Sequence, residues 1–132
     1  AILGFAQATR LPLEIKKIQK MRNYLEKRLE EIPKVNINSP KDALPTILNL
    51  SIQGIDAETL LKHLSSKGIY PSTGSACTSN KAQASSVLKA IGLNDSQALS
   101  SIRISLSKDS TKGEIDETIK HLKSIVSILR KL

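Results

Sequence analysis

Residues 46–54, "TILNLSIQG", and the residues that follow them, 55–68, "IDAETLLKHLSSKG", decide the fold of this chain. Apolar and polar side chains alternate over residues 47–52, as they do in a strand that is buried on one face. Leu48, Leu50 and Ile52 share one face, and Ile47, Asn49 and Ser51 share the other. The alternation ends at Gly54, where we expect the strand to end.

A helix is predicted directly after this strand. Asp56 is a favoured N-cap residue, and Leu60, Leu61 and Leu64 recur at helical spacing. Gly68 supplies the C-terminal stop. The next residues, "GIYPS" (68–72), predict a short strand at a sheet edge, because Pro71 cannot donate a ladder hydrogen bond.

Two further segments have the alternation of strands. "VNIN" (35–38) is one, and "SSIRISL" (100–106) is the other. In the second, three apolar side chains are expected to face the core and three polar ones to face away from it. These are Ile102, Ile104 and Leu106, and Ser101, Arg103 and Ser105.

Helices account for most of the remaining chain. The sequence predicts a short helix at residues 1–9, a long amphipathic helix at 12–32 and a short one at 85–92. Asn94 with Gln97, and Thr111 with Glu114, have the spacing of capping boxes, and the second predicts a helix that runs nearly to residue 132. We therefore expect one α+β domain over residues 1–132, a small sheet covered by helices.

Composition limits the function classes. The chain has 132 residues, a formal charge of +8, 39% hydrophobic and 24% charged residues, and only 2% aromatic residues. Acidic residues alternate with basic ones, as in "EIKKIQKMRNYLEKRLEEI" (14–32), which is typical of a solvated helix face and argues against nucleic-acid binding. No apolar run has the roughly 20 residues of a membrane span. We expect a cytoplasmic protein.

Cys77 is the only cysteine, and it lies in "STGSACTSN" (72–80) among small hydroxyl residues and Gly74. Free cysteines are usually buried, but this one has no bulky apolar neighbours and is predicted to lie on an exposed, adaptable loop. A thiolate is a good nucleophile, and exposed free thiols are avoided unless they are used. The nearest cations in sequence, Lys67 and Lys81, do not identify an activator of the thiol.

Arg103 is the second candidate site residue. It lies between Ile102 and Ile104 in the predicted strand, where a fixed guanidinium is suited to bidentate binding of a carboxylate. The alternative is an edge-strand arginine in water. His63 and His121 each lie inside a predicted helix without a second ligand at helical spacing, so no metal site is expected.

The residues around Cys77 and Arg103 resemble a known family. "GIYPSTGSACTS" (68–79), "SSVLKAIG" (85–92), "SSIRISL" (100–106) and "GEIDETI" (113–119) follow in the order found in the C-terminal domain of cysteine desulfurases, which are pyridoxal phosphate (PLP) enzymes of aminotransferase class V. "LPTILNLSIQG" (44–54) is similar to a segment that precedes them.

The resemblance implies an activity and its residues. It implies conversion of L-cysteine to L-alanine, with Cys77 carrying the sulfur as a persulfide and Arg103 binding the substrate carboxylate. It also implies a homodimer, a sulfur-acceptor protein such as an iron–sulfur scaffold or a transfer-RNA thiolation enzyme, and the small-domain fold of fold-type I PLP enzymes.

The chain does not contain the family's Ser-x-His-Lys cofactor motif. We therefore expect no cofactor-binding residue and no bound PLP here, and we expect the chain to be a C-terminal domain that is inactive without a large PLP-binding domain. Two alternatives are a stand-alone persulfide carrier or partner-binding module, and a basic nucleic-acid-binding domain.

Overall fold

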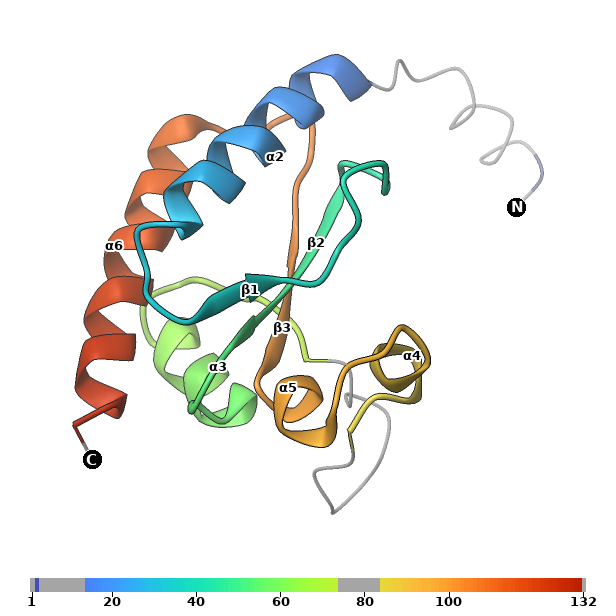
Figure 1. Cartoon of the computed structure of the whole chain (residues 1–132). Helices are drawn as coiled ribbons and strands as arrows, with labels where there is room; N and C mark the ends of the chain where they lie inside the picture. The colour runs from blue at the N-terminus through green and yellow to red at the C-terminus, as the bar shows by residue number, and fades with distance from the viewer. Residues whose placement is uncertain (1, 3–13, 74–83, 132) are drawn as a thin grey trace.

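Three strands form one antiparallel sheet with β2 at its centre (Figure 1). The computed structural model describes residue 2, residues 14–73 and residues 84–131. In it, β1 (Val35–Ile37) and β3 (Ser101–Ser105) both pair with β2 (Ile47–Ile52). The predicted strands at 35–38, 47–52 and 100–106 are confirmed, and so is the α+β class.

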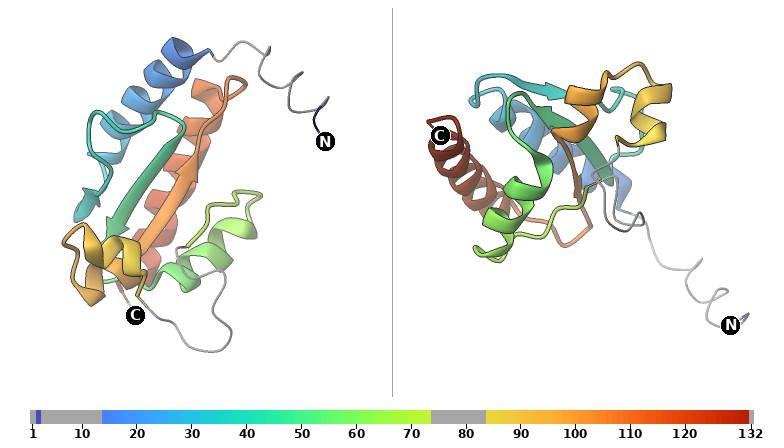
Figure 2. Two further views of the ribbon diagram at one scale, coloured as in Figure 1. Left: turned by 90° about the vertical axis from the view of Figure 1, so that its right-hand side faces the viewer. Right: turned by 90° about the horizontal axis from the view of Figure 1, so that it is seen from below.

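Helices cover one face of this sheet. α2 (Ile15–Leu29), α3 (Ala57–Ser65) and α6 (Lys112–Leu129) enclose a common core with β2 and β3. The left view of Figure 2 places α6 behind β2 and β3. The short helices α4 (Ser86–Ala90) and α5 (Asp95–Leu99) lead into β3.

The core follows the alternation of the strands. Leu48, Leu50 and Ile52 of β2 are fully buried, and Ile102 of β3 is 1% exposed. Because β-strand side chains point alternately to the two faces, the polar residues of β2 and β3 lie on the opposite face, which we call the open face. That face carries Asn49 and Arg103, so the fold presents the candidate arginine away from the core.

The predicted N-terminal caps at Asp56, Asn94 and Thr111 are confirmed. The carboxylate of Asp56 accepts hydrogen bonds from the backbone N–H of Thr59 at 2.8 Å and from its hydroxyl at 2.9 Å. Both capping boxes are also formed, at the starts of α5 and α6. Gly68 has the positive φ of 76° expected after a helix.

Loss of the Asp56 cap has a predictable cost. We expect Asp56→Ala to lower the free energy of unfolding by about 1 kcal/mol, because the first turn of α3 loses an acceptor for its backbone N–H. Asp56→Asn keeps that acceptor and should cost little. Chemical denaturation measures both, and an equal loss in the two variants would contradict the capping role.

Two predictions of secondary structure are wrong, one for a strand and one for the ends of a helix. Residues 68–72 do not form a strand; Ser72 alone makes an isolated bridge, to Arg103, because Pro71 has no N–H to extend the ladder. The long helix ends at Leu29 rather than at residue 32 and starts no earlier than Ile15 among the described residues. The predicted helix at 1–9 and Pro12 lie outside the described residues.

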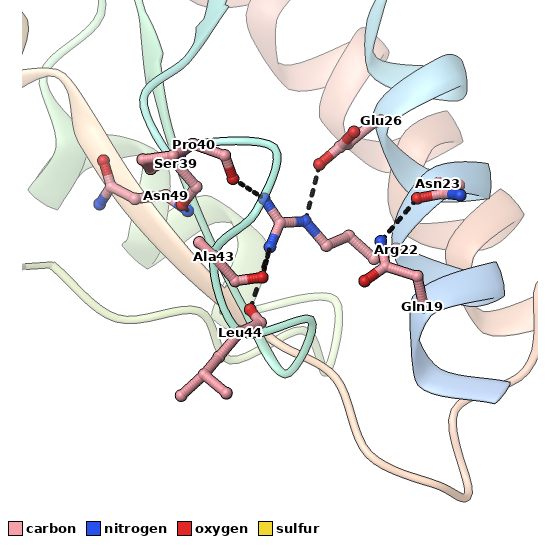
Figure 3. Close-up of polar contacts among 9 residues, drawn as sticks. All are labelled: Gln19, Arg22, Asn23, Glu26, Ser39, Pro40, Ala43, Leu44 and Asn49. Carbon is pink, nitrogen blue, oxygen red and sulfur yellow. Dashed lines mark hydrogen bonds and ion pairs between the residues drawn. The ribbon is translucent and has the colours of Figure 1, made fainter. Parts of the chain in front are cut away.

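One charged residue of α2 is buried, contrary to the prediction of a solvated charged face. Arg22 is 1% exposed, and its guanidinium donates to the carbonyls of Pro40 at 2.8 Å and of Ala43 and Leu44 at 3.0 Å each (Figure 3). Its Nε also donates to the Glu26 carboxylate at 2.7 Å. The side chain thus attaches α2 to the loop that joins β1 to β2.

Candidate functional site

Arg103 is the third residue of β3, and its side chain is exposed on the open face. Its cross-strand partner in β2 is Asn49. No described residue makes a hydrogen bond or ion pair with the guanidinium. A guanidinium presents its N–H groups as a planar fork that matches the two oxygens of a carboxylate.

The backbone of Ser72 pairs with Arg103 on the other edge of β3. The Ser72 N–H donates to the Arg103 carbonyl at 3.0 Å, and the Arg103 N–H donates to the Ser72 carbonyl at 2.7 Å. Cys77 follows Ser72 by five residues and lies outside the described residues.

This pairing relates the two predicted site residues to each other. The segment that bears Cys77 follows Ser72, which lies beside the backbone of Arg103, and precedes residue 84 and α4 in the sequence. The sequence predicted Cys77 and Arg103 as site residues, but it did not predict the backbone bridge between Ser72 and Arg103. The signal for this contact was weak, because a single bridge leaves no alternating pattern.

A polar cluster lies next to Arg103 on the open face, and the sequence did not predict it. Ser101 was expected to face away from the core beside Arg103, but it is 1% exposed, as is Ser51 opposite it. Their hydroxyls are 2.9 Å apart, and Ser101 donates to the Gln97 carbonyl at 2.7 Å. α5 therefore covers this part of the face, which explains the burial of both serines.

Asn38 completes the cluster from the end of β1. Its amide nitrogen donates to Asn49 Oδ1 and to Ser51 Oγ at 2.7 Å each, and lies 3.3 Å from Ser101 Oγ. The cluster fixes the orientation of Asn49, the cross-strand neighbour of Arg103. Side chains of β2 and β3, the amide of Asn38 just after β1 and the Gln97 carbonyl of α5 thus form one polar cluster on the face that carries Arg103.

The two histidines do not form a site in the described part of the chain. His63 is exposed on α3, and His121 Nε2 lies 2.9 Å from the Glu117 carboxylate on α6. Among the described residues, no group of three metal-ligating side chains comes together. None of the described helices has the length and apolar character that a membrane span requires.

A cavity of about 260 Å³ lies apart from these polar groups. It is lined by β3, the segment 69–71 and the first half of α6, with apolar residues such as Ile69, Ile104 and Ile115. Glu114 is its one charged lining residue and is already used in the capping box. Among the described residues, Arg103 on the open face has no charged partner, whereas this cavity has no charged lining residue besides Glu114.

The order of motifs around Arg103 has a match among known families. A sequence profile of the aminotransferase class-V family matches residues 1–118. The chain belongs to this family. The chain spans about a third of the length of the curated relatives that it matches.

Individual relatives agree with this assignment. Cysteine desulfurase IscS of Clostridium botulinum is 39% identical to this class-V chain over 140 residues, covering 99% of the chain and 35% of IscS. A solved NifS-like protein has a TM-score of 0.74 at 33% identity, covering 86% of the chain and 28% of that protein. The NifS-like protein from Rickettsia africae ESF-5 has a TM-score of 0.73 at 34% identity, with coverage of 86% and 29%.

Class-V enzymes use PLP, but the described side chains around Arg103 do not fit this cofactor. A lysine is needed to bond its aldehyde carbon, and a ring usually stacks on its pyridine. The described residues nearest to Arg103 on the open face are Asn49, Ser101 and Ser105, which supply neither group. Among the described residues, this part of the open face is suited to holding an anion.

Proposed function

We propose that this chain is the C-terminal small domain of a cysteine desulfurase. In this proposal Cys77 accepts the sulfur of L-cysteine, and Arg103 binds the carboxylate of that substrate. The single observation that carries the proposal is the bridge between Ser72 and Arg103, which places the start of the cysteine-bearing segment beside the strand that carries Arg103. The similarity to IscS over 99% of the chain supports the same assignment.

The sulfur transfer balances without an added oxidant. The Cys77 thiolate forms an S–S bond with the sulfur of L-cysteine while the C–S bond of the substrate breaks. The electron pair of that bond stays with the substrate carbon, which takes up a proton, and the products are L-alanine and a persulfide on Cys77. The PLP chemistry that weakens the C–S bond belongs to the large domain of the longer protein in which we place this chain.

The composition of residues 72–80 suits the role of Cys77. In the sequence, the neighbours of Cys77 are glycine, alanine and small hydroxyl residues, which add little bulk beside the thiol. A sulfur carrier must receive its cargo in a substrate pocket and release it to another protein outside that pocket. We propose that a sulfur-acceptor protein, such as an iron–sulfur scaffold or a transfer-RNA thiolation enzyme, takes the persulfide from Cys77.

The role of Arg103 is testable in the full-length protein that contains this chain. We expect Arg103→Ala to lower kcat/KM for L-cysteine about a hundredfold, because the carboxylate loses a bidentate, charge-assisted partner. Arg103→Lys keeps the charge without the fork and should lose less. Steady-state alanine formation measures both variants.

A control variant tests whether the loss of kcat/KM is specific to the charge of Arg103. Lys108 is an exposed cation shortly after β3, and Lys108→Ala should leave kcat/KM within about twofold of the unmodified protein. Equal losses in the Arg103 and Lys108 variants, or no loss in either, would rule out a specific role for Arg103.

A further inference from the structure

We propose that Asn49 is a second binding residue for the substrate carboxylate, donating a hydrogen bond from its Nδ2 beside the guanidinium of Arg103. The inference rests on the proposed function, since it assigns a partner to the carboxylate that Arg103 binds. It depends on two features of the described residues: the register of β2 and β3, and the direction of the hydrogen bonds in the cluster around Asn38.

The register brings the two side chains close together. Asn49 and Arg103 are directly opposite each other in the antiparallel pair. The backbone N–H and carbonyl of Arg103 bond to Ser72, on the edge of β3 that faces away from β2. The Asn49 carbonyl accepts from the Asn38 N–H at 2.9 Å, on the edge of β2 that faces away from β3. Asn49 and Arg103 are therefore a non-hydrogen-bonded pair, the kind in which Cα atoms lie only about 4.5 Å apart and side chains approach most closely.

A backbone carbonyl fixes the direction of the hydrogen bonds. The Gln97 carbonyl can only accept, so the Ser101 hydroxyl donates to it. The Ser101 oxygen then accepts from the hydroxyl of Ser51, 2.9 Å away, and the Ser51 oxygen accepts from the Asn38 amide nitrogen. The second hydrogen of that amide goes to Asn49 Oδ1 at 2.7 Å.

The same chain of bonds leaves one group of Asn49 unused. Its Oδ1 accepts a hydrogen bond from Asn38, on the β1 side of β2, so its Nδ2, which is bonded to the same carbon, points away from Asn38. Within the described part of the chain, no acceptor bonds to this Nδ2. Asn49 is half-buried, and its orientation is set by its neighbours before any ligand arrives.

This arrangement suits a carboxylate. An ionised carboxylate has about four acceptor positions, and a bidentate arginine uses two of them. A neutral amide can bond to a remaining position without repelling the guanidinium. Because the amide is already oriented, little side-chain entropy is lost when the ligand binds.

Two variants of the full-length protein separate binding by Asn49 from its structural role. Asn49→Asp keeps the acceptor for Asn38 but replaces the free donor with a negative charge that repels the carboxylate. Asn49→Ala removes both groups. Asn36, an exposed residue of β1 on the same face of the sheet, provides the control variant Asn36→Ala.

Each protein is assayed for product formation with L-cysteine and with L-cysteine methyl ester, which lacks the carboxylate. With L-cysteine, we expect Asn49→Ala to raise KM about tenfold and Asn49→Asp to raise it further, both with kcat within about twofold. With the ester, both should match the unmodified protein within about twofold. Asn36→Ala should have no effect on either substrate.

The outcomes separate this inference from the proposed function. If the Asn49 variants change KM for both substrates equally, or for neither, Asn49 does not bind the carboxylate. If Arg103→Ala lowers kcat/KM equally for L-cysteine and for the ester, the proposed function itself is wrong. An effect of Asn49→Asp that is confined to L-cysteine supports binding, because a structural role would not depend on the substrate carboxylate.

Discussion

Cys77→Ser in the full-length protein is expected to lower the rate of alanine formation from L-cysteine by at least about a thousandfold. A serine hydroxyl is almost entirely protonated near neutral pH, whereas a thiol is partly ionised and more nucleophilic. The oxygen also cannot form the S–S bond in which the sulfur leaves the substrate. Alanine release under substrate saturation measures the effect.

Ser75→Ala is the matched control for this prediction, since Ser75 lies two residues away in the same segment. It removes a hydroxyl without touching the thiol, and its rate should stay within about threefold of the unmodified protein. A Cys77→Ser variant that turns over L-cysteine at the rate of this control would exclude Cys77 as the sulfur acceptor.

Arg22→Ala is expected to lower the free energy of unfolding by about 4 kcal/mol. The substitution leaves the carbonyls of Pro40, Ala43 and Leu44 without their donor and opens a cavity between α2 and the loop that joins β1 to β2. For a domain of this size, the melting temperature should fall by roughly 10–15 °C. Thermal and chemical denaturation of the chain test this.

Two further variants make the Arg22 prediction specific. Lys20→Ala removes an exposed charge from the same helix and should cost less than about 0.5 kcal/mol. Arg22→Lys keeps a charge but cannot reach three carbonyls and the Glu26 carboxylate at once, so it should lie between the two. Equal stability of the Arg22 and Lys20 variants would show that the buried contacts are not needed.

The features that the sequence predicts well depend on nearby residues. The alternation in β2 and β3, the cap at Asp56 and the capping box of Thr111 with Glu114 each involve positions within a few residues of one another. Such patterns reflect the periods of strands and helices directly. They sufficed to predict the α+β sheet and the exposure of Arg103.

The burial of Arg22 could not be predicted in the same way. Its three carbonyl acceptors lie 18 to 22 residues further along the chain, and a backbone carbonyl carries no signature in the identity of its residue. The sequence around it has the alternating charges of an exposed helix face. Only the packed position of the loop joining β1 to β2 distinguishes Arg22 from its solvated neighbours.

The residues of the candidate site differ in the same way: some were predictable from their neighbours in the sequence, and others depend on distant contacts. Arg103 was predicted because its alternation within β3 is local, and Cys77 because its neighbours are all small. Asn49 was placed on the correct face, but its pairing with Arg103 depends on the register of two strands that are about fifty residues apart. The burial of Ser101 depends on α5, which no periodic pattern relates to the sheet.

The most direct test of the account is mass spectrometry of the peptide that contains Cys77. The full-length protein is incubated with L-cysteine for a single turnover and then digested without a reducing agent. We predict that this peptide gains one sulfur atom for each alanine released, and that a thiol reductant removes it. Release of alanine with an unmodified Cys77 peptide, or with the added sulfur on another peptide, would contradict the account.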